Sequence, residues 1–206
     1  MKSYPSISRE IRRGVPVFLF GKHDGSCMRV EWNRKNGFHK FGRRNGLLDD
    51  SNPILKRSPD LFLAKYGEDL GRIFTDERLA ETTTCFFEFH GPSSFAGTHV
   101  EAEPQTVTMF DVSVYKKGFL EPKAFMKLFD GLDVQECLAQ GNVTAELEEQ
   151  VRAGTLPGMP FEGVVAKGAL DRKSGLPLMF KIKSRAWIAR LKDFCKGNEA
   201  LFEKLL

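Results

Sequence analysis

Apolar residues recur along the chain in the spacings that are typical of strands and of helices. Short apolar or alternating runs bounded by glycine, asparagine or proline predict strands at residues 15–20, 26–32, 38–44, 84–90, 105–115, 163–167 and 178–183. Asn36-Gly37 predicts a hairpin turn between the second and third of these runs. A turn around residues 173–175 is expected between the last two. Because hairpins rather than regular strand-helix alternation connect the strands, the pattern predicts an α+β fold built on antiparallel sheets.

Four helices are predicted from apolar residues at helical spacing together with end signals. They begin near Pro59, Pro122, Thr144 and Ser184, and the third is acidic and ends at Gly154. The last helix is expected to bury Trp187, Ile188, Leu191 and Phe194 on one face.

Composition indicates an ordinary globular protein. The 206 residues are 41% hydrophobic and 28% charged, which fits a single domain over residues 1–206. The four cysteines lie too far apart in sequence for a zinc site. The N-terminus has no apolar signal core, and the apolar run 15–20 is too short to span a bilayer. We therefore expect a soluble cytoplasmic protein with no membrane partner.

Charge is uneven along the sequence. The formal net charge is +4, which permits binding to a polyanion. Basic residues dominate up to Arg57, acidic residues dominate from Asp130 to Glu162, and the chain is basic again after Val164. The two basic segments could form a groove that faces phosphates, or they could be ordinary solvated surfaces.

The first candidate for chemistry is Lys22, which follows the apolar run 15–20 and precedes a tight Asp24-Gly25 turn. A lysine becomes a useful nucleophile when burial or nearby cations lower its pKa, and a neighbouring glycine lets a phosphate approach the backbone. The same pattern also fits a surface lysine in front of a turn.

Five further residues combine polar chemistry or an aromatic ring with a predicted strand. Lys181 and Lys183 are two residues apart and share one strand face, where they would either bind phosphate or discourage edge aggregation. Glu162 leads into a buried strand, as a metal ligand or as a partner for a lysine. Glu88 and Phe110 are candidates for a pocket wall, and they also fit an edge acid and a core residue.

In their order, these residues resemble the motifs of the covalent nucleotidyltransferases, the ATP-dependent polynucleotide ligases and their capping-enzyme relatives. Lys22-His23-Asp24-Gly25 resembles the signature of the adenylated lysine, and Arg43-Arg44-Asn45-Gly46 resembles the arginine motif that follows it. Glu88, Phe110, Glu162-Gly163 and residues 181–183 fall where the later motifs belong. Residues 88–92 and 109–112 are most similar to phage-type RNA ligases that seal nicked duplex RNA.

The resemblance implies a nucleotidyltransferase domain, an ATP-grasp-like ligase adenylation fold of antiparallel sheets flanked by helices. It implies an ATP-dependent RNA ligase in which Lys22 takes AMP from ATP and passes it to a 5′-phosphate. The activated 5′-phosphate is then joined to a 3′-hydroxyl. Lys181 and Lys183 would then contact the α-phosphate. Arg44, or Arg43 in a shifted register, would hold a phosphate.

The resemblance also implies roles for the remaining motif residues. Glu88 would accept a hydrogen bond from a ribose hydroxyl, and Phe110 would stack on adenine. Glu162, with Asp24 as a second candidate, would help to hold Mg²⁺ or Mn²⁺. The expected partner is nicked or broken RNA, with DNA as an alternative.

Ligases and capping enzymes commonly add a C-terminal domain, of the OB type in several of them. The stretch from residue 184 to residue 206 is too short for one, so a minimal catalytic domain without an OB domain is expected. A small ATP-dependent DNA ligase, a capping guanylyltransferase, and a non-catalytic nucleotide-binding or nucleic-acid-binding module of the same fold stay open. The sequence also leaves the oligomeric state open.

Overall fold

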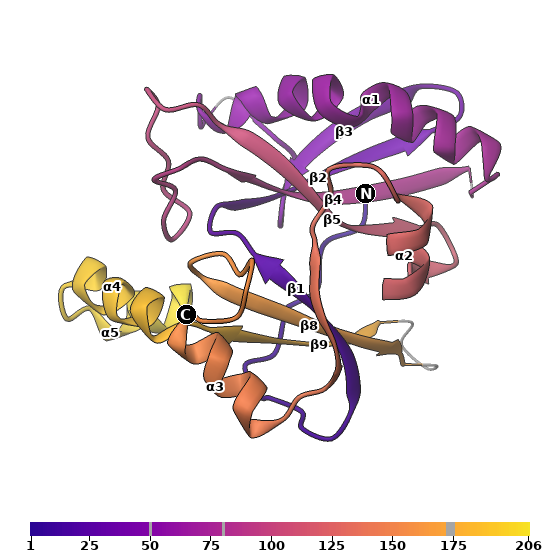
Figure 1. Ribbon diagram of the computed structural model, residues 1–206. Coiled ribbons are helices and arrows are strands. Elements are labelled where there is room, and N and C mark those ends of the chain that lie inside the picture. The colour runs from indigo at the N-terminus through magenta and orange to yellow at the C-terminus, as the bar shows by residue number, and fades with distance from the viewer. Residues whose placement is uncertain (50, 80, 172–175) are drawn as a thin grey trace. The chain divides into compact units, whose positions relative to one another are not determined.

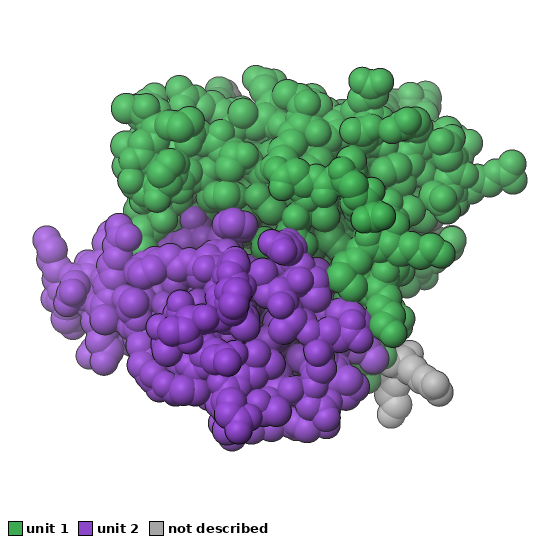
Figure 2. Space-filling view, viewed as in Figure 1, with its two compact units in different colours: residues 1–5, 25–135, 170–176 green, residues 6–24, 136–169, 177–206 purple. Residues whose placement is uncertain are grey.

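The structure is a computed structural model that describes residues 1–49, 51–79, 81–171 and 176–206. This part of the chain divides into two compact units, which Figure 2 colours separately. Unit 1 comprises Met1–Pro5, Gly25–Gln135 and Leu170–Leu176, and unit 2 comprises Ser6–Asp24, Glu136–Ala169 and Pro177–Leu206. The chain therefore leaves unit 2 after Asp24 and returns to it after Gln135.

Unit 1 is built on an antiparallel sheet with the strand order β3-β2-β4-β5-β6 among the described residues. These strands are β2 (Ser26–Asn33), β3 (Gly37–Arg43), β4 (Thr82–His90), β5 (Thr106–Val114) and β6 (Gly118–Phe119). The long helix α1 (Ser58–Asp76) lies along one face of the sheet (Figure 1), and α2 (Pro122–Leu128) and a short 3₁₀ turn, Leu55–Arg57, complete the unit.

The core of unit 1 lies between α1 and the sheet. Phe62, Tyr66, Leu70 and Phe74 recur at helical spacing and pack against strand residues that include Phe87. Phe62 and Phe87 have ring centroids 4.7 Å apart. The face of the sheet that carries Phe87 is therefore occupied by core packing, which leaves the opposite face for other uses.

Unit 2 is built on an antiparallel sheet with the order β7-β1-β8-β9. Its described elements are β1 (Pro16–Lys22), β7 (Cys137–Asn142), α3 (Ala145–Ala153), β8 (Gly163–Leu170), β9 (Pro177–Lys183), α4 (Arg185–Cys195) and α5 (Glu199–Leu205). Val17 and Leu19 of β1 pack with Val151 of α3 and with Phe180 and Ile182 of β9. Apolar burial thus places β1 in the interior of its sheet, between β7 and β8.

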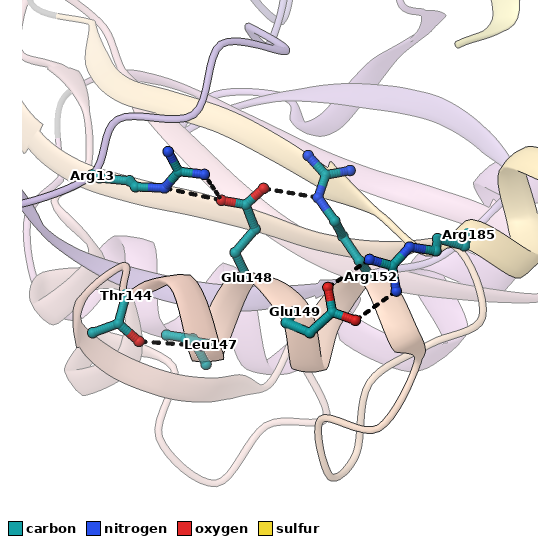
Figure 3. A network of polar contacts seen from close by, with 7 residues as sticks. All are labelled: Arg13, Thr144, Leu147, Glu148, Glu149, Arg152 and Arg185. Carbon is teal, nitrogen blue, oxygen red and sulfur yellow. Dashed lines mark hydrogen bonds and ion pairs between the residues drawn. The ribbon is translucent and has the colours of Figure 1, made fainter.

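Ion pairs fix α3 to neighbouring segments of unit 2 (Figure 3). Thr144 caps the helix by accepting a hydrogen bond from the backbone N–H of Leu147. Glu148 accepts from Arg13, in the segment before β1, and from Arg152 one turn along the helix. Arg185 at the start of α4 donates through both terminal nitrogens to Glu149. The acidic helix therefore has partners for these carboxylates within its own unit.

Most predicted elements are confirmed, and the predicted α+β class with antiparallel sheets is correct. The predicted turn at residues 173–175 lies outside the described residues. The assignment of Phe194 to the buried face of the last helix is wrong, because Phe194 is exposed and Cys195 is buried in its place. β7 and α5 were not predicted. No helix within the described ranges is long and apolar enough to cross a bilayer.

Candidate functional site

Lys22 is the last residue of β1, and the paired strands place it next to an acidic side chain. In the β1–β8 register Lys22 lies opposite Gly163, the residue after Glu162. The Lys22 Nζ donates to Glu162 Oε2 at 2.8 Å. The interpretation of Lys22 as an ordinary surface lysine is therefore wrong, because its side chain is only 22% exposed and is paired with a buried carboxylate.

Glu162 lies at a close approach between β8 and β9. Gly163 has a φ of +140°, and a Cβ at this position would lie 2.1 Å from the carbonyl oxygen of Ile182. Glycine is therefore required here, and it allows the start of β8 to approach the end of β9. The Ser184 N–H donates to the Glu162 carbonyl at 2.9 Å. This backbone geometry holds the Glu162 side chain beside the end of β9.

The second partner of Glu162 is Lys183, the last residue of β9. Lys183 Nζ lies 3.0 Å from Glu162 Oε1, and both side chains are almost fully buried. The two oxygens of one carboxylate therefore each contact a lysine, Lys22 on one and Lys183 on the other. The sequence offered Glu162 as a metal ligand or a lysine partner, and in this structure it is the partner of two lysines.

Burial and crowding perturb the lysines of β9. Burial, followed by the like charges of Lys183 and Lys22, lowers the pKa of Lys181 to about 8. Burial is also the main cause that lowers the pKa of Lys183 to about 8, with Glu162 opposing the shift and Lys22 adding to it. Three amines thus lie close enough to repel one another, and such a cluster suits an anionic ligand that brings compensating charge.

Sequence reasoning missed the part that Trp187 of α4 plays here. Its Nε1 donates to Asp24 Oδ2 at 2.5 Å, and the Lys183 Nζ lies 3.4 Å from the centroid of its ring. The helical spacing identified Trp187 as buried, which is correct, since it is 1% exposed. A buried tryptophan needs a partner for its N–H, and this requirement is the signal that could have pointed to Asp24.

In unit 1, Glu88 and Phe110 lie on the sheet face opposite α1. Glu88 is half-buried between the buried Phe87 and Phe89 of β4. Phe86 pairs with Asp111 and Phe87 pairs with Met109, so Phe110 is the extra residue of a β-bulge. A bulge redirects a side chain, and Phe110 is half-buried within an otherwise buried stretch of β5. Phe110 is therefore less buried than the interpretation as a core residue predicts.

Tyr4 of the N-terminal segment packs on the same face and was not singled out from the sequence. Its ring meets Phe110 edge-on, with centroids 5.0 Å apart and an interplanar angle of 85°. Its hydroxyl donates to Asp111 Oδ2 at 2.9 Å. Burial, and then the charge of Asp111, raise the pKa of Tyr4 well above its ordinary value, so the hydroxyl stays protonated as a donor.

Of the two arginines of the predicted arginine motif, Arg43 is the last residue of β3 and Arg44 follows it. Arg44 is exposed and its Nη2 donates to the carbonyl of Pro5 at 3.4 Å. Arg43 pairs with Asp49 at 2.8 Å. Both belong to unit 1 with Glu88 and Phe110, whereas Lys22, Asp24, Glu162, Lys181 and Lys183 belong to unit 2. Each unit thus contains its own subset of the predicted residues.

Two carboxylates, Glu162 and Asp24, are the predicted metal ligands. Within the described ranges no group of three or more histidine, cysteine, aspartate or glutamate side chains could hold a metal. Glu162 and Asp24 are both in unit 2, as hard oxygen donors of the kind that Mg²⁺ prefers. A divalent ion there would take most of its ligands from water or from phosphate, which is the usual coordination of Mg²⁺ beside a nucleotide.

Comparison with known proteins supports the resemblance at the level of the fold. No family model and no curated protein sequence matches the chain. Among solved structures, a protein from Aquifex aeolicus assigned as an ATP-dependent DNA ligase aligns with 100% of this chain and 59% of its own, at 20% identity and a TM-score of 0.65. An archaeal ATP-dependent RNA ligase aligns with 95% of this chain and 52% of its own, at 19% identity and a TM-score of 0.66.

A Naegleria gruberi RNA ligase solved with ATP and Mn aligns with 88% of this chain and 52% of its own, at 19% identity and a TM-score of 0.59. The chain thus spans between half and three fifths of the length of the structures it matches. The mixed architecture with two antiparallel sheets agrees with the fold of these structures. The chain has the fold that these ATP-dependent DNA and RNA ligases share.

Proposed function

We propose that this chain is an ATP-dependent RNA ligase that acts through a covalent lysyl-AMP intermediate on Lys22. The observation that carries the proposal is the cluster at the end of β1, in which Lys22 and Lys183 each contact one oxygen of Glu162. In a fold shared with ATP-dependent ligases, this cluster places a candidate nucleophile beside cations that can hold a phosphate.

The proposed reaction has three in-line transfers at phosphorus. The Lys22 Nζ loses a proton and attacks the α-phosphorus of ATP, a P–N bond forms, and the bond to pyrophosphate breaks. An oxygen of a 5′-phosphate next attacks the same phosphorus, the P–N bond breaks, and the amine regains a proton. A 3′-hydroxyl finally attacks the activated 5′-phosphate and AMP leaves. Such transfers depend mainly on positioning and on neutralisation of charge.

The residues of unit 2 suit these needs. Lys181 and Lys183 would neutralise the α-phosphate, and loss of a proton from Lys22 would relieve the repulsion among the three amines. A bound Mg²⁺ or Mn²⁺ would supply further charge neutralisation at the phosphates. Glu162 and Asp24 are the residues that would hold it, and Glu162 Oε2 becomes available when Lys22 carries AMP and is no longer an ammonium.

We propose that both units act as one catalytic domain over residues 1–206, with unit 1 binding the nucleoside. Glu88 would accept from a ribose hydroxyl, Phe110 would stack on adenine, and Arg44 would bind a phosphate. The support is that Glu88 and Phe110 share one sheet face and that Phe110 is half-exposed on a bulge.

Incubation with labelled nucleotide and Mg²⁺ tests the proposal. We expect label from ATP, and not from GTP or NAD, on a protein band that survives denaturation. Label from GTP would indicate a capping guanylyltransferase. A complete absence of label would contradict a ligase and favour a nucleotide-binding or nucleic-acid-binding module.

A small ATP-dependent DNA ligase is the second candidate, because the Aquifex aeolicus structure is as similar in fold as the archaeal RNA ligase. Sealing of matched nicks in RNA and DNA duplexes distinguishes the two. We expect faster sealing of the RNA nick, and equal or faster sealing of the DNA nick would favour the DNA ligase.

The lowered lysine pKa values predict a pH dependence of phosphate binding. An ordinary lysine stays protonated up to about pH 10.5, whereas Lys181 and Lys183 lose their charge as the pH rises through about 8. Each added pH unit above 8 lowers the protonated fraction of each lysine about tenfold, so AMP should bind about tenfold more weakly at pH 9 than at pH 7 for each lysine whose charge it needs. Calorimetry with AMP, which has no leaving group, measures this effect. Constant affinity up to pH 10 would contradict it.

Substitution of Phe110 tests the predicted adenine platform. Phe110→Ala should raise the KM for ATP about 5- to 150-fold, because a base that loses an aromatic platform loses roughly 1–3 kcal/mol. Phe110→Tyr and Phe110→Leu keep a flat or apolar surface and should have smaller effects. Adenylation rates at varied ATP concentrations measure the KM. Equal small effects of the three substitutions would assign Phe110 to packing alone.

Salt dependence tests the predicted basic surfaces. The cations proposed to hold the strand are the half-buried Arg43 and the exposed Arg34, Lys35, Lys40, Arg185, Arg190 and Lys192. In the structure Lys40, Arg43 and Arg185 pair with Glu31, Asp49 and Glu149, so these three must exchange partners to bind a strand.

Each phosphate contact costs about 0.7–0.9 log units of affinity per tenfold increase in salt. Sealing of a nick should therefore fall steeply between low and physiological salt. Adenylation of the protein uses only a small nucleotide, so it should fall little. Paired salt titrations of the two steps measure this difference, and parallel curves would contradict a polynucleotide contact through these cations.

A further inference from the structure

Trp187 contacts two residues of the candidate site through two different parts of one rigid ring. Its ring face lies 3.4 Å from the Lys183 Nζ, and its Nε1 donates to Asp24 Oδ2. Asp24 is two residues after Lys22, and Lys183 shares Glu162 with Lys22. A single side chain thus connects the lysine expected at the α-phosphate with the turn that follows the expected nucleophile.

The indole is itself held in place by the backbone around it. Trp187 is 1% exposed, and its backbone N–H donates to the Ser184 Oγ at 3.1 Å in the first turn of α4. The Ser184 Oγ donates to the carbonyl of Phe161 at 2.7 Å, and the Ser184 N–H donates to the carbonyl of Glu162 at 2.9 Å. The ring is therefore fixed relative to Glu162, and its own rotamer cannot change without breaking buried packing.

We infer that Trp187 is a positioning residue for the proposed adenylyl transfer, which orients Lys183 through its ring face and Asp24 through its Nε1. This inference rests on the proposed function. The ring face attracts the buried ammonium of Lys183 and limits where it can move. The indole N–H donates to one oxygen of Asp24, so that this carboxylate is directed to α4.

The two contacts predict separable effects of two substitutions. Trp187→Phe keeps a ring face for Lys183 and removes the donor to Asp24, so the affinity for AMP should stay within about threefold of wild type. The rate of adenylation at saturating ATP should fall about 10- to 100-fold, because a hydrogen bond to a charged group is lost. Trp187→Leu removes both contacts and should also weaken AMP binding about tenfold.

A double-substitution cycle tests the route through Asp24. Asp24→Ala and Trp187→Phe should not be additive, because each one removes the same hydrogen bond. The double variant should therefore adenylate at about the rate of Asp24→Ala alone. Additive losses would show that Trp187 does not act through Asp24.

Leu191→Ala is the structural control, because Leu191 is fully buried on the same helix and takes no part in the candidate site. If Leu191→Ala lowers the Tm as much as the Trp187 substitutions do, and also lowers AMP affinity and the adenylation rate as they do, the role of Trp187 is packing alone. Equal effects of Trp187→Phe and Trp187→Leu on AMP affinity and on rate would also overturn the inference. A wild-type chain that binds no AMP and forms no adduct would contradict the proposed function itself, and the inference with it.

Discussion

Lys22→Ala should form no covalent adduct from labelled ATP and should keep its fold. The alanine side chain has no amine that could form the P–N bond, so the loss of adduct should be complete rather than partial. Glu162 keeps Lys183 as a partner after the substitution, so the buried carboxylate is not left without a counter-charge. Denaturing electrophoresis after incubation with labelled ATP measures the adduct, and a thermal melt measures the fold.

Two variants make the Lys22 experiment specific. Lys22→Arg keeps a cation for Glu162 and should also form no adduct. Lys167→Met removes another buried lysine of the same sheet, whose ammonium lies over the Phe20 ring, and should retain the adduct. Labelling of Lys22→Ala would mean that a different residue is the nucleophile, and the proposed mechanism would be wrong.

Glu162→Gln should lower both stability and adenylation. The substitution removes the charge that two lysines share in a buried site, and the loss of one partner of a buried ion pair costs about 3 kcal/mol. The rate of adduct formation should fall about 10²-fold, because Lys22 and Lys183 lose their common anchor. Urea unfolding at pH 7 measures the first effect, and adduct formation with saturating ATP measures the second.

The stability loss in Glu162→Gln should shrink as the pH rises past about 8. The pKa of Lys183 is lowered to about 8, so above this pH its amine is neutral and needs no counter-charge. Glu149→Gln is the matched control, because Glu149 is an exposed glutamate of the same unit that also pairs with a cation, Arg185. This control should leave stability almost unchanged. Similar losses in the two variants would show that the buried cluster has no special role.

Local structure could be predicted from the sequence where one interaction decides it. Val15–Phe20 and the α1 residues Phe62 and Tyr66 follow clear apolar periods, and burial on a single face makes them strand and helix. β7 was missed because none of its residues is fully buried, so its apolar pattern is weak. α5 was missed because none of its residues is fully buried, so the sequence shows no clear apolar face there.

The candidate site could be predicted in part. The motif order identified Lys22, Glu162 and Lys183, and the structure places these three side chains in one cluster. The motif order could not show that Glu162 bridges both lysines, because Lys22 and Glu162 are 140 residues apart in sequence and meet only through the pairing of β1 with β8. Trp187 was identified only as a core residue, because a helical period reports burial and not the partner of an indole N–H.

The order of the chain segments has a consequence for how the protein forms during synthesis. The strand that ends in Lys22 is made early, but its partners in the sheet come more than a hundred residues later, and pairings of such high contact order form slowly. The segment Gly25–Gln135 emerges from the ribosome after β1 and before β7, β8 and β9, and it contains nearly all of its own unit. Until β8 and β9 have been made, the apolar residues of β1 lack their native cover, and the nascent chain is prone to aggregation over that interval.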